Sequence, residues 1–363
     1  MNQKKLRIAL AMIATATPFI LQADMQTSTD QESSMYKSGE QIKDSQLQGA
    51  YGQSASYNLN NQWDIFLTAD FIYWKQSQVL NGAADVATLG TSILNASHSL
   101  ELAQPGYKPG FQVGLGFNMK GMDNWNLYSE YTWYQNNSSK TVTAGSGEVL
   151  ILMPVGFEVI TAAEKTSKSK LNYNNLNLSL ERPFYWGKKL TSNFGCGLRA
   201  LWLSQHFTSD VSGLDAISLT GGSHVTLSGS ATRTLQSKSW ALGPRINVDS
   251  DWLLGYGFKV LGNAAASVLY TKYTDVSGSF KGDAVLGAHS LQNGSTVSIK
   301  NGASALTPIL ETGLGLGWGS YFGSKDNFHF DLSVGYDFNI LWRGIAGGNL
   351  FLYGLNIGTR FDF

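Results

Sequence analysis

Long segments in which apolar and polar residues alternate run from residue 63 to the end of the sequence, and they restrict its fold more than any other feature. One segment has an apolar residue at every second position, namely Phe328, Phe330, Leu332, Val334, Tyr336 and Phe338. The residues between them are polar or small, namely His329, Asp331, Ser333, Gly335 and Asp337. Because successive side chains of a β-strand point to opposite faces, this alternation predicts strands with one apolar and one polar face.

Ten such strands are predicted, and most of them are longer than ten residues. They cover residues 63–77, 109–120, 125–135, 169–182, 189–206, 237–248, 252–271, 306–321, 327–341 and 349–363. Strands of soluble proteins average about five or six residues, whereas a tilted strand needs about nine to eleven to cross a membrane. After the first thirty residues, no run of eighteen apolar residues is present that could form a membrane helix.

Short and long connections alternate along these strands. The short links are 121–124, 183–188, 249–251 and 322–326, with 342–348 as a short link in a long position. The long links are 78–107, 136–168, 207–236 and 272–305. Bacterial membrane barrels have short periplasmic turns, long external loops and an even number of strands. The sequence therefore predicts an all-β fold over residues 63–363, a transmembrane antiparallel up-and-down β-barrel of about ten strands.

An apolar patch inside the predicted link 136–168 leaves the number of strands open. It comprises residues 149–153 together with Val155, Phe157 and Val159. The patch could fold inward as a constriction, add a hairpin or contact a partner. If it supplied two further membrane strands, the barrel would have twelve.

The tryptophans group near the predicted strand ends. We expect Trp63, Trp125, Trp186 and Trp252 at the periplasmic rim. We expect Trp74, Trp133, Trp240 and Trp342 near the outer rim. Tryptophan prefers a membrane interface because its ring is apolar and its N–H needs a partner.

Residues 1–23 have the features of a cleaved signal peptide. Lys4, Lys5 and Arg7 precede an apolar stretch at residues 8–21, and Ala23 is small at the expected cleavage site. A retained anchor helix is the alternative. Residues 24–62 are rich in Gln, Ser and Asn, and we expect a flexible periplasmic lead-in there.

Charge and cysteine content exclude several classes of function. Without the first 23 residues the chain has 23 basic and 26 acidic residues, a net charge of −3, which argues against nucleic-acid binding. Cys196 is the single cysteine, so neither an intramolecular disulfide nor a cysteine metal site is expected. No cofactor and no metal is predicted.

The last predicted strand ends on aromatic residues. Phe361 and Phe363 continue its apolar face to the last residue of the sequence. A terminal aromatic after an alternating strand resembles the signal by which outer-membrane barrels are recognised for assembly. This makes the outer-membrane assembly machinery an expected partner.

Several segments resemble the Legionella-type major outer membrane proteins, a pore-forming barrel family. They are 195–202 (GCGLRALW), 239–245 (SWALGPR) with 251–252 (DW), 66–74 (FLTADFIYW) and 351–355 (FLYGL). The resemblance runs from about residue 62 to the C-terminus. It implies a porin of the outer membrane and supplies neither catalytic residues nor a substrate.

Charged residues on the predicted inward face suggest how such a barrel would work. A basic arc is expected from Arg199, Arg245 and Lys259. An acidic arc is expected from Asp70, Glu130, Glu311, Asp331 and Asp337. In a wet lumen these arcs would select solutes by charge, whereas in a narrow lumen they would pair and fill it. Inward glycines, such as Gly114, Gly116, Gly313 and Gly319, would leave space or permit curvature.

An enzyme is a weaker interpretation, because the five histidines do not converge. His98, His224 and His289 lie in three predicted loops, His206 on the lipid face and His329 on the inward face. We therefore predict a porin-like diffusion channel in contact with outer-membrane lipid, small hydrophilic solutes and ions. A homo-oligomer is compatible with this prediction. The alternatives are a surface adhesin or a structural barrel with a plugged lumen and, less favoured, an outer-membrane hydrolase.

Overall fold

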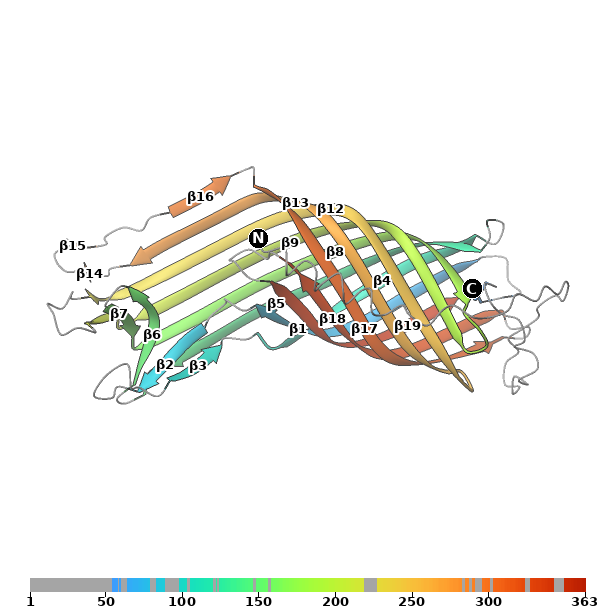
Figure 1. Cartoon of the computed structure of the whole chain (residues 1–363), viewed down its shortest axis with the longest axis horizontal. Coiled ribbons are helices and arrows are strands. Elements are labelled where there is room, and N and C mark those ends of the chain that lie inside the picture. The colour runs from blue at the N-terminus through green and yellow to red at the C-terminus, as the bar shows by residue number, and fades with distance from the viewer. Residues whose placement is uncertain are drawn as a thin grey trace, which may run out of the picture. The chain divides into compact units, whose positions relative to one another are not determined.

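The fold is a closed antiparallel barrel of ten strands (Figure 1). The computed structural model describes residues 54–57, 59, 64–78, 83–88, 98–102, 105–119, 122, 124–145, 148–155, 158–218, 227–282, 285–286, 289–290, 296–300, 303–323, 327–342 and 349–363. The barrel strands are β1 (Ile65–Gln78), β4 (Tyr107–Met119), β5 (Trp125–Thr143), β8 (Glu164–Tyr185), β9 (Leu190–Ser212), β12 (Ser230–Gly255), β13 (Phe258–Gly282), β17 (Ser304–Phe322), β18 (Phe328–Leu341) and β19 (Leu350–Asp362).

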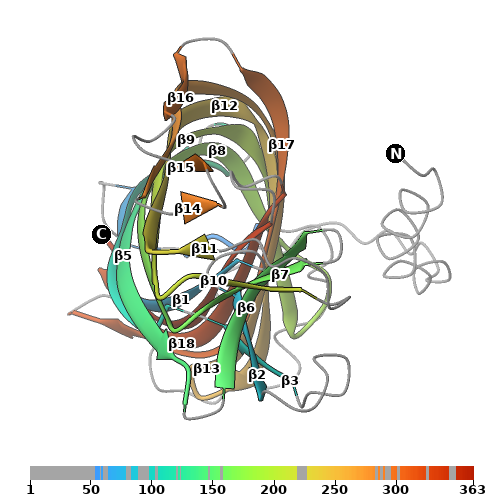
Figure 2. The same cartoon turned by 90° about the vertical axis from the view of Figure 1, so that its left-hand side faces the viewer.

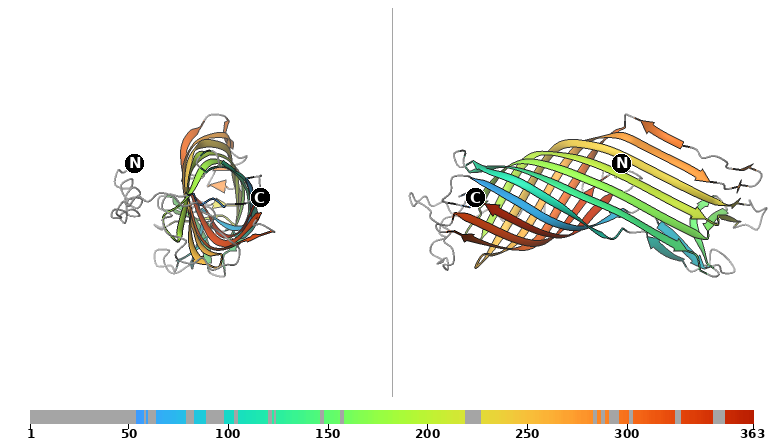
Figure 3. Two further views of the ribbon diagram at one scale, coloured as in Figure 1. Left: turned by 90° about the vertical axis from the view of Figure 1, so that its right-hand side faces the viewer. Right: turned by 180° about the vertical axis from the view of Figure 1, so that it is seen from behind.

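Each barrel strand pairs with the barrel strands before and after it in the chain, and β19 pairs with β1 to close the wall. All ten predicted strands and the up-and-down order are confirmed. The strands cross the barrel axis obliquely (Figure 3). Among the described residues, no helix is long and apolar enough to span a membrane.

The two faces of the wall differ as the alternation predicts. Large apolar side chains such as Leu115, Phe117 and Leu314 are exposed on the outside, Leu115 to 55%. Residues of the opposite phase, such as Asn118 and Asp331, are buried. Such extensive exposed apolar surface requires an apolar surrounding, which a lipid bilayer provides.

One predicted turn is displaced. The sequence suggested a link at 249–251, but β12 continues to Gly255 and turns at Tyr256 and Gly257, which have φ of 52° and 81°. Two-residue hairpin turns with positive φ at both positions match the twist of the flanking strands. Residues 249–251 instead continue the ladder with β9, where Asp251 lies opposite Thr191.

Five strands extend far into the predicted long links. β5, β8, β9, β12 and β13 pair on to the level of Thr143, Glu164, Ser212, Ser230 and Gly282. We call this part of the wall the sheet extension. It lies at the end of the barrel opposite the short turns, here named the long-loop end (Figure 1).

A second sheet lies at the long-loop end. It has the strand order β10 (Asp215–Ser218), β7 (Glu158–Ala162), β6 (Glu148–Val155), β2 (Ala83–Thr88) and β3 (His98–Leu102). In the view along the barrel, part of it crosses in front of the opening (Figure 2). The apolar patch predicted in link 136–168 thus contributes to the paired strands β6 and β7 of the second sheet. These strands are not part of the barrel wall, so the twelve-strand alternative is wrong.

The second sheet and the sheet extension share a small hydrophobic cluster. Leu150 of β6 and Ala162 of β7 are buried together with Val142, Leu214 and Ala231. The remaining short strands are β11 (Leu227–Ser228), β14 (Val285–Leu286) and β15 (His289–Ser290), which form a third sheet, and β16 (Thr296–Lys300), which pairs with β13.

Candidate functional site in the barrel interior

All eight charged residues predicted to face inward lie in the barrel interior. Seven of them line two interior cavities, namely Asp70, Glu130, Arg245, Lys259, Glu311, Asp331 and Asp337. The eighth, Arg199, is 1% exposed and pairs with Glu311. The basic and acidic groups are therefore in direct contact at some points, and are not two separate arcs.

Glu311 of β17 is the centre of one ion network. Arg199 of β9 donates to its Oε1, and Arg245 of β12 donates to its Oε2 at 3.2 Å. Arg199 also donates through Nε to the side-chain oxygen of Asn177 at 2.8 Å. This carboxylate thus neutralises part of two buried guanidinium charges.

Four other inward carboxylates have no basic partner within ion-pair distance among the residues that the structure describes. They are Asp70, Glu130, Asp249 and Asp337, and with Arg245 and Glu311 they line a cavity of about 150 Å³. Neutral donors contact three of them: Asn177 donates to Glu130 at 3.0 Å, Asn247 to Asp249 at 3.2 Å and Asn356 to Asp337 at 3.0 Å. The cavity is therefore acidic.

Asp249 was not among the predicted inward residues, because residues 249–251 were assigned to a turn. Asp249 lies four residues from Arg245 on β12, so both side chains are on the same face of the strand, the one that faces the interior. Extending the predicted strand 237–248 by one residue would have identified it.

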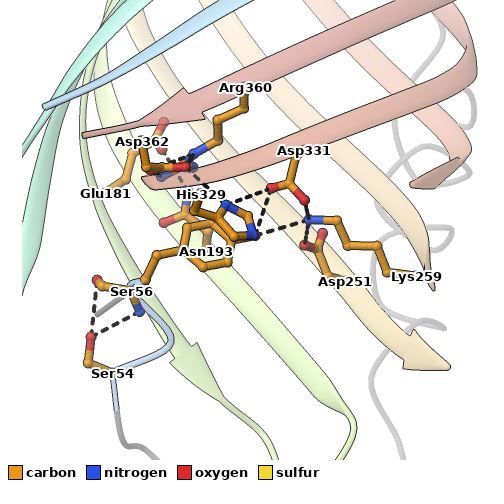
Figure 4. Close-up of polar contacts among 11 residues, drawn as sticks. Ser54, Ser56, Glu181, Asn193, Asp251, Lys259, His329, Asp331, Arg360 and Asp362 are labelled. Carbon is orange, nitrogen blue, oxygen red and sulfur yellow. Dashed lines mark hydrogen bonds and ion pairs between the residues drawn. The ribbon is translucent and has the colours of Figure 1, made fainter. Parts of the chain in front are cut away.

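A second charged cluster lies near the short-turn end (Figure 4). Lys259 contacts Asp251 at 3.0 Å and Asp331 at 3.1 Å. Arg360 and His329 both contact Asp362, at 2.7 Å and 3.3 Å. Around this cluster lies a cavity of about 210 Å³, which shares Asp70 with the first cavity.

Tyr57, from the predicted lead-in, fills part of this second cluster. Its hydroxyl donates to Asp331 at 2.8 Å and accepts from Lys259 at 3.1 Å, and its ring stacks on His329 at 3.7 Å between centroids. Burial, followed by the nearby carboxylates of Asp331 and Asp251, raises the pKa of the Tyr57 phenol well above its ordinary value. The phenol therefore stays neutral and remains a donor to Asp331.

The segment that carries Tyr57 is attached to the wall. Ser54 forms a β-bridge with Phe184, and the Ala55 N–H donates to the Pro183 carbonyl at 3.1 Å. Residues 54–57 are therefore packed against the barrel, in contrast to the flexible lead-in expected there. The predicted signal peptide, residues 1–23, and residues 24–53 lie outside the described residues.

An apolar layer crosses the interior towards the long-loop end. It is a contacting cluster of buried, inward side chains from nine of the ten strands, namely Ile72, Trp74, Tyr134, Leu171, Tyr173, Leu201, Ala241, Leu269, Ile309, Leu341, Leu350 and Leu352. Within several strands the inward residues change from polar to apolar at this level, for example from Asp70 to Ile72 and Trp74 on β1. Each of these side chains is at most 4% exposed, so little solvent reaches this level of the barrel.

The inward glycines accommodate neighbouring side chains. A side chain at Gly116 would collide with the ring of Phe66, and one at Gly114 with Thr68 and Tyr128. These glycines therefore allow large side chains of adjacent strands to occupy the interior, and they do not leave it open.

The tryptophans follow the prediction only in part. Trp186 and Trp252 are exposed near strand ends, whereas Trp240 is exposed in the middle of the longer strand β12. Trp63 lies outside the described residues. Trp74 was expected at the outer rim, but it is buried in the apolar layer, where its indole N–H donates to Asp337 at 3.2 Å. Even-numbered residues of β1 face the interior. The prediction for Trp74 considered only its place near the strand end and not the direction of its side chain.

The remaining predicted residues have simpler surroundings. Phe361 and Phe363 contact each other near Phe328. His206 lies on the outside of β9 beside Thr208. Over the described part of the chain, no three His, Cys, Asp or Glu side chains are grouped so that they could hold a metal ion.

Comparison with known proteins gives a family and several distant structures. Residues 55–349 match the profile of the family described as Legionella pneumophila major outer membrane protein precursor. A search of curated proteins gave no match.

Three solved structures illustrate the similarity. Outer membrane protease OmpT from Escherichia coli is 9% identical with a TM-score of 0.35, over 85% of this chain and 99% of that one. Ail, the attachment invasion locus protein of Yersinia pestis, is 7% identical with a TM-score of 0.24, over 83% and 99%. A FadL homologue of Pseudomonas aeruginosa is 10% identical with a TM-score of 0.25, over 82% and 89%. Similarity of this degree supports no assignment of function.

Proposed function

Since the chain belongs to the Legionella major outer membrane protein family, an outer-membrane family, we propose that it is a porin-like channel for passive diffusion of ions and small hydrophilic solutes. The observation that carries this proposal is the set of four inward carboxylates without a basic partner, Asp70, Glu130, Asp249 and Asp337, around one cavity. The channel is expected to favour cations.

Electrostatics supports a hydrated interior. A carboxylate without a counter-ion keeps its charge only where water reaches it, because an unpaired charge in a dry environment is very costly. In addition, Arg199 Nη1 and Arg245 Nε are buried and have no hydrogen-bond partner among the described residues. Buried donors of this kind are normally satisfied by water. Water around uncompensated acidic groups is the environment that attracts and passes cations.

The described conformation is a closed one under this proposal. The apolar layer closes the long-loop side of the acidic cavity, and Tyr57 occupies the short-turn side of the second cavity. Hydrophobic constrictions close channels by excluding water, and small displacements of their side chains allow water back. We therefore expect opening to begin at the apolar layer.

A second candidate is a structural or adhesive barrel with a permanently plugged lumen. The apolar layer and the ion pairs of Arg199 and Arg245 with Glu311 favour it, because both fill the interior. The sheet extension would then be the functional surface. An enzymatic role has less support. A catalytic histidine would need an exposed face, but His329, which contacts Asp331 and Asp362, is covered by the stacked ring of Tyr57.

Current recording in planar bilayers tests the channel. The folded full-length protein, with a salt gradient across the bilayer, should give discrete conductance steps and a reversal potential that indicates preference for the cation. The triple variant Asp70→Asn/Glu130→Gln/Asp337→Asn should still conduct, with its cation-to-anion permeability ratio reduced towards one. Unchanged selectivity would remove the acidic cavity from the conduction path.

Variants of the apolar layer separate the channel from the plugged barrel. Leu269→Ser/Leu352→Ser places hydroxyls in the layer and should raise the probability of opening, because a polar constriction holds water more readily. The matched outward change Leu115→Ser should leave the current unaltered. If both the wild type and Leu269→Ser/Leu352→Ser are folded and silent, the barrel is plugged and the channel proposal fails.

A further inference from the structure

The outer face of three neighbouring strands, β9, β12 and β13, carries an aromatic patch. Trp202 of β9 lies directly opposite Trp240 of β12. The ring of Trp240 lies 6.3 Å from that of Tyr270 on β13, and all three side chains are exposed on the outside of the barrel. Exposed Trp and Tyr side chains of membrane barrels gather at the level of the lipid headgroups. We call these three residues the aromatic patch.

Basic side chains follow the aromatic patch immediately on its long-loop side. Lys238 lies two residues from Trp240 and Lys272 two residues from Tyr270, so each shares the outward face of its strand. Lys170 of β8 lies opposite His206 of β9. Lys272 is also the direct neighbour of Trp240 across the β12–β13 ladder. These four side chains form an outward basic stripe across β8, β9, β12 and β13.

The lysines of the basic stripe are available to bind an anion. In the part of the chain that the structure describes, none of the three forms an ion pair, whereas Lys168, farther along β8, pairs with Asp210 at 3.0 Å. Asp275, opposite Lys238, accepts a hydrogen bond from Gln236 at 3.1 Å. Lys170, Lys238 and Lys272 are all exposed. The stripe therefore has an excess of positive charge.

The outward residues beyond the stripe contain no large apolar side chain. On β12 they are Gln236, Thr234, Thr232 and Ser230. The apolar face of the wall thus ends at the aromatic patch, and the basic stripe lies directly at the expected boundary between acyl chains and water. Lysines at this boundary attract phosphate groups of lipids.

We propose that the basic stripe and the aromatic patch together bind a phosphorylated lipid headgroup in the leaflet at the long-loop end, with phosphate on the lysines and the acyl chains against the aromatic patch. This rests on the outer-membrane location and on long loops facing outward. It does not depend on whether the barrel conducts.

Binding of a defined lipid to the folded, full-length protein in non-ionic detergent tests the proposal. The probe is diphosphorylated lipid A, compared with the same lipid after removal of its phosphates, and native mass spectrometry measures the bound fraction. We expect the phosphorylated form to bind at least tenfold more tightly. The variant Lys170→Gln/Lys238→Gln/Lys272→Gln should bind it on the order of 100-fold more weakly, since each lysine near a lipid surface contributes about one kcal/mol.

Two controls keep the result interpretable. Lys188→Gln/Lys189→Gln removes two exposed lysines at the short-turn end and should bind like the wild type. Lys170→Arg/Lys238→Arg/Lys272→Arg keeps the charge and should retain binding even where the glutamine variant folds poorly. Equal binding of both lipid forms by the wild type, or unchanged binding by a folded glutamine variant, would overturn the proposal. So would loss of lipid binding in the presence of moderate inorganic phosphate, which would indicate a site for free phosphate.

Discussion

Arg199 is the largest fully buried side chain among the described residues, and it carries a charge. It is 1% exposed, and its charge is balanced by Glu311, which also binds Arg245. We predict that Glu311→Gln lowers the free energy of unfolding by about 3–5 kcal/mol, because two buried guanidinium groups lose their anion. Urea unfolding of the purified barrel in lipid, followed by tryptophan fluorescence, measures this difference.

Arg245→Gln provides the comparison, since it leaves the pair of Arg199 and Glu311 intact and removes a more exposed group. We expect it to cost clearly less stability than Glu311→Gln. Equal stability of Glu311→Gln and the wild type would mean that water, and not Glu311, balances Arg199.

The inward phase of single residues could be predicted from sequence, but their partners could not. Period two is a local property, so it assigned Arg199, Glu311 and Asp331 to the interior from their own strands. Which of them meet depends on the register around a closed wall and on the distance across it. Tyr57 shows the limit most clearly, because nothing in its polar surroundings in the sequence indicates that it enters the barrel.

Strands could be predicted only as far as they face lipid. Within the membrane, one face must be apolar, and the alternation is strong. In the sheet extension, outward residues such as Thr166, Thr208 and Thr232 face water, so the hydrophobic alternation ends although the hydrogen-bond ladder continues. The same reason explains why the predicted long links appeared to be unstructured loops.

The second sheet should depend on the small cluster that it shares with the sheet extension, and not on the apolar layer of the barrel interior. Leu150 is fully buried among Val142, Ala162, Leu214 and Ala231. We predict that Leu150→Asp opens the second sheet and makes it sensitive to limited proteolysis, because a charge in an apolar cluster without a partner is strongly unfavourable. The barrel should keep the resistance to heat and detergent that is seen as a mobility shift in gels.

Leu150→Ala is the milder companion, with an expected local cost of about 2–5 kcal/mol and intermediate protease sensitivity. If Leu150→Asp also abolished the gel shift of the folded barrel, the two hydrophobic clusters would form one cooperative unit, and the separation argued here would be wrong.

The interior of the whole barrel is a sequence of layers. From the long-loop end, the apolar layer comes first, then the acidic cavity, then the second cavity with Lys259 and Arg360, and finally Tyr57. Composition and alternation indicated a polar interior with charges. They did not indicate closure, because closure results from side chains of nine strands meeting at one level, and no single segment encodes that level.

Tyr57 gives the prediction that belongs to this scale. Its ring and hydroxyl contact Lys259, His329 and Asp331, so Tyr57→Ala should connect the second cavity to the short-turn side. Under the proposed function, we expect a conductance several times larger, or more frequent opening, in planar bilayers. Tyr57→Phe retains the stacked ring and loses the two hydroxyl hydrogen bonds, and its current should lie between those of Tyr57→Ala and the wild type.

A second tyrosine at the same end of the barrel serves as the matched control. Tyr256 lies in the β12–β13 turn and is 82% exposed, so Tyr256→Ala removes an identical side chain without touching the interior. Its current should equal that of the wild type. If Tyr57→Ala also gave the wild-type current while Leu269→Ser/Leu352→Ser gave a larger one, the apolar layer alone would control permeation. The segment around residue 57 would then anchor the chain to the wall through Phe184 and have no part in gating.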